Sequence, residues 1–180
     1  MNKRKIKTLD IVSVGVFAAI LAILSQISIP LPVGVPVTLQ TFAAALCGYF
    51  LGWKKGFAAV LVYIMLAAAG VPVLAGFCGG ISYIVGLTGG FIYGFLFMAV
   101  LCGLPLKHKA LKIASGCAGL LLCHLCGIFQ YGLIAGEGFV NSFFLVSAPF
   151  LIKDIASVTA ALFCAAIITK AVEKKSAAIG

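Results

Sequence analysis

Residues 11–53 read IVSVGVFAAILAILSQISIPLPVGVPVTLQTFAAALCGYFLGW and contain no charged side chain. A transmembrane helix needs about 20 consecutive apolar residues, so this stretch can form two helices and a turn. The turn is expected at residues 30–36 (PLPVGVP), because proline ends helices and glycine accepts turn geometry. Lysines stand on either side of the stretch, at Lys7 and Lys54. The pattern predicts a helical hairpin that leaves one membrane surface and returns to it.

Two further charge-poor stretches, residues 56–106 and 113–169, repeat this pattern, and glycine or proline interrupts each of them near its middle. We therefore expect an all-α integral membrane protein with six transmembrane helices, forming a single domain over residues 1–180. The expected spans are residues 8–29, 38–52, 56–70, 88–105, 110–134 and 147–171. Long loops outside the membrane would cap a ligand pocket.

The basic residues give the orientation of these helices. The chain has 13 lysines and arginines and a net charge of +9. All of them except Lys153 fall in four clusters at the ends of the charge-poor stretches: Lys3, Arg4, Lys5 and Lys7; Lys54 and Lys55; Lys107, Lys109 and Lys112; Lys170, Lys174 and Lys175. Because basic residues mark the cytoplasmic side of a membrane, both termini are expected to be cytoplasmic. The charge therefore indicates membrane orientation and not a nucleic-acid partner.

The composition excludes most soluble classes of protein. Hydrophobic residues make up 63% of the chain and charged residues 9%, against about 45–50% and 25% in ordinary soluble domains. The basic N-terminus followed by an apolar run is also typical of a signal peptide. Residues 25–28 (SQIS) form a poor cleavage site, so we expect the first helix to be retained in a multi-pass protein of a prokaryotic cell membrane.

Polar residues cluster in the expected outer half of the bundle. Lys153 and Asp154 lie about one turn after Pro149, and ionisable residues inside a membrane usually face a cavity or a partner. The alternative is that Lys153 extends to the outer surface and Asp154 caps a loop. Successive helical positions point about 100° apart, so the two side chains are not expected to pair. Further polar residues at this depth are Thr38, Gln40, Thr41, Ser82, Tyr83, Gln130 and Tyr131. Together they predict a pocket that opens outward.

Residues 76–90 combine glycines with apolar side chains such as Phe77 and Ile81. This composition favours a lid folded over the bundle, the alternative being a plain flexible loop. In the first helix, Ala18 and Ala22 are small residues four apart, which fits either a docking face for a partner helix or packing inside the bundle.

Catalytic signals are weak. The chain has no phosphate-binding loop, no Ser/His/Asp set and no paired carboxylates, so we expect no enzymatic activity and no hydrolysis of ATP by the chain itself. Residues 123–126 (CHLC) leave open a small intramembrane metalloenzyme, but a structural zinc needs four ligands. We therefore interpret the cysteines as ordinary small apolar residues and His124 as a hydrogen-bonded helix-packing residue, the alternative being a role in a cavity. No metal or other cofactor is expected.

Four segments resemble the BioY family of biotin-specific S components, the substrate-binding subunits of energy-coupling factor transporters. They are residues 35–42 (VPVTLQTF), 70–80 (GVPVLAGFCGG), 86–91 (GLTGGF) and 149–154 (PFLIKD). The resemblance implies a six-helix bundle that binds biotin near the outer surface and works with a transmembrane T component and two cytoplasmic ATPases. It also implies that Ala18 and Ala22 dock on the T component. The expected ligand contacts are Thr38, Gln40, Phe42, Phe77, Gly79, Gly80, Tyr83, Phe91, Gln130, Tyr131, Lys153 and Asp154.

One departure from the family pattern leaves the ligand open. Many members carry a lysine three residues after the aspartate, where this chain has Ser157. Lys153 is the candidate replacement, although it should project from another face. A related acid such as lipoate therefore remains an alternative ligand.

Overall fold

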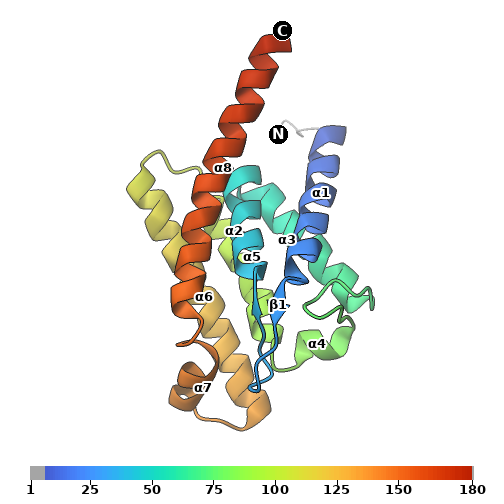
Figure 1. Cartoon of the computed structure of the whole chain (residues 1–180), viewed down its shortest axis with the longest axis vertical. Helices are drawn as coiled ribbons and strands as arrows, with labels where there is room; N and C mark the ends of the chain where they lie inside the picture. Colours follow the sequence, from blue (N-terminus) through green and yellow to red (C-terminus); the bar gives the residue numbers. More distant parts are fainter. Residues whose placement is uncertain (1–6, 180) are drawn as a thin grey trace, which may run out of the picture.

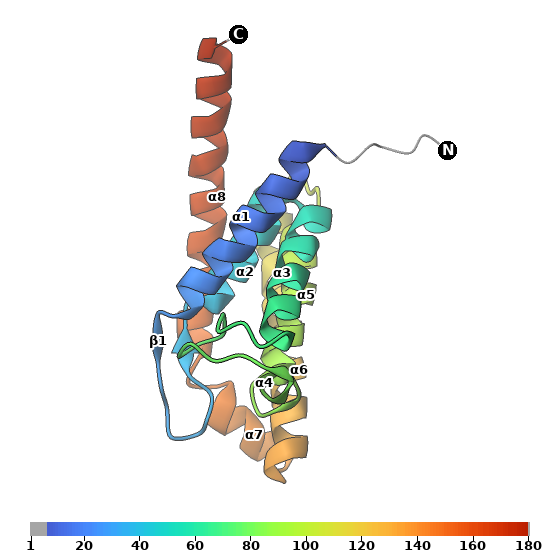
Figure 2. The same ribbon diagram turned by 90° about the vertical axis from the view of Figure 1, so that its right-hand side faces the viewer.

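The computed structural model describes residues 7–179, which form a bundle of helices with a short hairpin at one end (Figures 1 and 2). The elements are α1 (Thr8–Ser25), β1 (Ser28–Ile29), β2 (Val37–Thr38), α2 (Gln40–Leu51), α3 (Trp53–Ala68), α4 (Ile81–Val85), α5 (Gly89–Cys102), α6 (Lys109–Ala135), α7 (Phe139–Val146) and α8 (Leu151–Ile179).

A helix occupies each of the six expected spans. Three helices, α1, α6 and α8, are long and apolar enough to cross a membrane, while α2 and α5 are apolar but shorter. α2 begins at Gln40, two residues after its expected start, because Val37 and Thr38 pair as a strand with Ile29 and Ser28. The proline-rich turn expected at residues 30–36 connects the two strands of this β-hairpin. The helices α4 and α7 were not predicted and lie in the two later loops.

The core forms where small residues let helices approach closely. On α2, Ala43, Ala44 and Ala45 are completely or almost completely buried. On α5, a side chain added at Gly94 would come within 2.6 Å of the Cys123 Cα atom on α6. The backbones of α5 and α6 are therefore in contact, as is common for small residues in membrane helix pairs.

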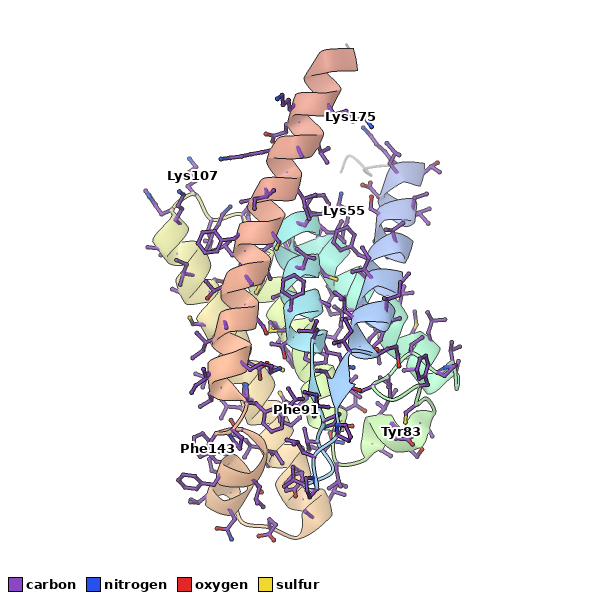
Figure 3. The ribbon with its side chains drawn as sticks, viewed as in Figure 1. Lys55, Tyr83, Phe91, Lys107, Phe143 and Lys175 are labelled. Atoms are coloured by element: carbon purple, nitrogen blue, oxygen red, sulfur yellow. The ribbon has the colours of Figure 1, made fainter. Side chains whose placement is uncertain are left out.

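The lysines labelled in Figure 3 lie toward one end of the molecule. Lys55, Lys107 and Lys175 lie toward the end where α1 begins and α8 ends, whereas Tyr83 and Phe143 lie toward the opposite end (Figure 3). Near the first end, Lys55 and Asp10 form an exposed ion pair of 3.2 Å. The predicted cluster members Lys3, Arg4 and Lys5 lie outside the described residues.

The two alanines expected to dock a partner face inward. The side chain of Ala18 is buried in the main core, and Ala22 is partly buried against the same core. This placement favours the packing alternative, because a buried side chain cannot meet another protein. The neighbouring small pair, Gly15 and Ala19, is exposed instead.

Candidate ligand site

A cavity of about 710 Å³ has Tyr83 and Phe91 in its wall. Both residues lie in the half of the molecule away from Lys107 and Lys175 (Figure 3). The cavity wall comes from the β-hairpin, the start of α2, the segment 74–88, α5, α6 and the start of α8. Such a volume lies within the usual range for small-molecule sites. Six of the twelve predicted contacts line it: Thr38, Gln40, Tyr83, Phe91, Lys153 and Asp154.

Lys153 and Asp154 form an ion pair at the cavity wall, between the lysine Nζ and the aspartate Oδ1. The prediction that these neighbours would not pair was wrong, because the four-carbon stem of lysine lets its ammonium curl back beside the next residue. Lys153 also does not extend to the outer surface. Its Nζ donates a hydrogen bond of 2.9 Å to the carbonyl oxygen of Thr38, which ties α8 to the hairpin.

His124 completes this charged group from α6. Its Nε2 lies 3.2 Å from the Asp154 Oδ2, and its Nδ1 lies 2.8 Å from the Ser147 Oγ. The Phe91 ring meets the imidazole edge-on, with 5.8 Å between the ring centroids. Asp154 is only 5% exposed, so its carboxylate depends on these partners for compensation. The sequence predicts a hydrogen-bonded packing role for His124 in preference to a cavity role, whereas the residue lines the cavity. A buried imidazole needs a hydrogen-bond partner. Asp154 is the one acid expected well inside a membrane span, so the pairing of His124 with Asp154 could have been predicted from the sequence.

Neutral polar groups fix the adjoining wall. The Gln40 side chain donates from Nε2 to the Tyr63 hydroxyl over 2.7 Å and accepts at Oε1 from the Thr38 hydroxyl over 3.1 Å. The Gln40 backbone N–H donates back to that hydroxyl over 3.2 Å. These contacts hold Thr38 and Gln40 in one orientation at the cavity, beside the Lys153–Asp154 pair.

The expected lid, residues 76–90, and the residues just before it form one segment, 71–90, that glutamines hold near both ends. This segment is called the lid below. From the end of α1, Gln26 donates to the carbonyl oxygens of Val73 and Leu74 over 3.2 and 3.1 Å and accepts from the Phe77 N–H over 2.9 Å. From α6, Gln130 donates to the carbonyl oxygens of Ile84 and Gly86 over 3.2 and 2.8 Å. Gln130 therefore positions the lid and does not line the cavity, which corrects its predicted contact.

The other five predicted contacts also lie outside the cavity wall. Phe42 packs against the main core, and Tyr131 belongs to a second core cluster with Val146 and Phe150. Phe77 is 73% exposed and is not among the lining residues of the cavity.

Gly79 and Gly80 shape the lid without lining the cavity. A side chain at Gly79 would come within 2.4 Å of the Val71 carbonyl oxygen, and Gly80 has a φ of 108°, a conformation that favours glycine. In turn, the wall contains residues that were not among the predicted contacts: Thr41, Cys78, Ser82, Thr88, Phe95, Cys123 and His124.

Among the described residues, no group of three or more His, Cys, Asp or Glu side chains comes together to hold a metal ion. Within the CHLC segment, Cys123 and His124 line the cavity while Cys126 does not. The metalloenzyme alternative has no ligand set in this part of the chain.

Comparison with known proteins places the chain in a family. Residues 1–174 match the model of the BioY family. The chain belongs to the BioY family. It is 36% identical over 159 residues to the probable biotin transporter BioY of Pyrococcus horikoshii, covering 88% of this chain and 95% of that protein. It is 43% identical over 123 residues to the biotin transporter BioY of Thermotoga maritima, covering 67% and 72% of the two chains.

The fold matches a solved structure described as the S-component for biotin from an ECF-type ABC transporter. The TM-score is 0.82 over 94% of this chain and 95% of that chain, at 23% identity. This BioY chain therefore shares the S-component fold.

Proposed function

We propose that this BioY protein captures biotin at the outer face of the membrane, as the S component of an energy-coupling factor uptake transporter. The observation that carries the proposal is the buried group of Lys153, Asp154 and His124 at the wall of a cavity facing away from the basic clusters. The names of the curated relatives support biotin as the ligand.

The site has the chemistry that the ureido ring of biotin requires. This ring presents two N–H donors and one carbonyl acceptor. The Asp154 Oδ1 is buried and contacts the Lys153 ammonium, and a carboxylate oxygen has two lone pairs, so the second one can accept from a ureido N–H. The Lys153 ammonium, which has three N–H donors, can reach the ureido carbonyl. Phe91, Ile92 and Phe95 would pack against the apolar thioether ring and chain.

The wider arrangement is part of the same proposal. The chain would form one domain of six membrane spans with both termini in the cytoplasm of a prokaryotic cell. Capture requires no cofactor and no catalysis by this chain. A transmembrane T component and two ATPase subunits would supply the energy, because this sequence has no phosphate-binding loop of its own. The exposed Gly15 and Ala19 offer a close approach to the T component.

Titration calorimetry of the purified protein tests the proposal, with binding of one biotin per chain as the expected result. Asp154→Asn should weaken binding by up to about 1.5–3 kcal/mol, because the charged acceptor of the ureido N–H is replaced by a neutral amide. Glu137→Gln is the matched control, since it removes an acid from an exposed loop. Absence of biotin binding, or equal affinity in both variants, would contradict the proposal.

Lipoate is the competing ligand for the same assay. Its dithiolane ring has no N–H donors, so it would leave the Asp154 carboxylate without a new partner. Ser157, whose identity raised this alternative, is buried and does not line the cavity. We expect biotin to displace bound lipoate. If lipoate binds more tightly than biotin, lipoate becomes the proposed ligand in place of biotin.

A further inference from the structure

The two ends of the cavity differ in charge and exposure. Its deep end is formed by the buried residues Thr38, Gln40, His124 and Asp154, together with Lys153. Its mouth is formed by lining residues that are exposed: Pro30, Gly34, Gly76, Ser82, Tyr83 and Ile134. All ionic groups of the wall are therefore at the deep end.

The deep end is already balanced. Lys153 is the one lysine or arginine of the described residues that lines the cavity, and it contacts both the Asp154 carboxylate and the Thr38 carbonyl oxygen. A ligand carboxylate placed there would add a second negative charge beside a buried aspartate. Burying a charge without a partner is costly, so this end selects a neutral group with donors and an acceptor.

The mouth offers hydrogen bonds but no positive charge. Ser82 and Tyr83 provide hydroxyl groups, and Tyr83 is 44% exposed. A carboxylate at this end would remain in contact with water and would contribute little selectivity, since exposed charges are screened.

Building on the proposed function, we infer that the protein recognises biotin without recognising its carboxylate. The substrate class then includes neutral derivatives at the carboxyl end, esters and amides of biotin, among them biotin joined to the ε-amino group of lysine. Specificity resides in the ureido ring at the deep end.

Calorimetry with biotin, biotin methyl ester and biotinamide tests this inference on the full-length protein. We expect the dissociation constants of the ester and the amide to lie within about fivefold of that of biotin, the range that exposed charge contacts produce. Diaminobiotin, which keeps the carboxylate but lacks the ureido carbonyl, should bind much more weakly. A larger loss for both neutral derivatives would overturn the inference, as would full affinity for diaminobiotin.

A charge added at the mouth provides a second, independent measurement. Ser82→Lys should favour the acid over the methyl ester by about two- to fivefold at low salt, and the preference should shrink as salt is raised. Ser82→Gln is the control of similar length without charge. An unchanged acid-to-ester ratio in Ser82→Lys would place the carboxylate elsewhere and overturn the inference. If biotin itself does not bind, the proposed function fails; if biotin binds and only its ester and amide fail, the proposed function stands.

Discussion

At the scale of single residues, the central feature is the dependence of Asp154 on two partners from different helices. Its Oδ1 contacts Lys153 on its own helix, and its Oδ2 lies 3.2 Å from the His124 Nε2. The Ser147 hydroxyl fixes the other side of the imidazole over 2.8 Å. The carboxylate is therefore held in place before a ligand arrives, which lowers the ordering cost of binding.

Lys153→Met should destabilise the protein, because it leaves the Asp154 charge buried with less compensation. Breaking a fully buried ion pair costs about 3–5 kcal/mol of stability. The loss of stability should be smaller here, since 27% of the lysine side chain is exposed. The double variant Lys153→Met/Asp154→Asn should recover much of the stability. Thermal unfolding in detergent measures both, and an equally unstable double variant would argue against charge balance as the role of Lys153.

At the scale of elements, the lid is joined to the end of α1 through two side chains: Gln26, and Ser25, whose hydroxyl also donates to the Val73 carbonyl oxygen. Gln26→Leu removes the bonds to Val73, Leu74 and Phe77 while keeping a similar volume. Each lost bond is worth about 0.5–1.5 kcal/mol, so we expect biotin to dissociate about tenfold faster or more. Stopped-flow displacement measures the rate.

Ser13→Ala is the matched control for this experiment. It removes a hydroxyl from the same helix, where Ser13 bonds only to the Leu9 carbonyl within the described contacts. Unchanged dissociation from Gln26→Leu would show that these bonds do not hold the lid.

The positions of the helices could be predicted from the sequence because charge clusters and apolar length constrain them directly. The contents of the loops could not. The hairpin pairing of Ser28 with Thr38 involves only two residues in each strand, too few for an alternating pattern to appear. The sites of Gln130 and Phe42 were missed for a related reason: a helical residue can be assigned to a depth from sequence, whereas the face it presents depends on how neighbouring helices pack.

At the scale of the whole molecule, the basic clusters and the cavity lie toward opposite ends (Figure 3). This arrangement predicts that reagents outside the cell reach the cavity end and not the basic end. Cysteines introduced at Glu137 and at Lys107 should respond differently to a membrane-impermeant maleimide applied to intact cells. At position 137, we expect labelling of intact cells above the level of the parent protein. At position 107, we expect such labelling only after the cells are permeabilised. The reverse result would invert the proposed orientation.

The internal charge balance of the binding site also has an electrical consequence. The Lys153–Asp154 pair has no net charge, so it neither adds to nor offsets the charge of a bound ligand. Biotin carries one negative charge, and taking an anion into a cell with a negative interior costs about 2.3 kcal/mol per 100 mV. A neutral biotin amide avoids this cost. The membrane potential would thus oppose uptake of the free vitamin while leaving uptake of its amides unaffected.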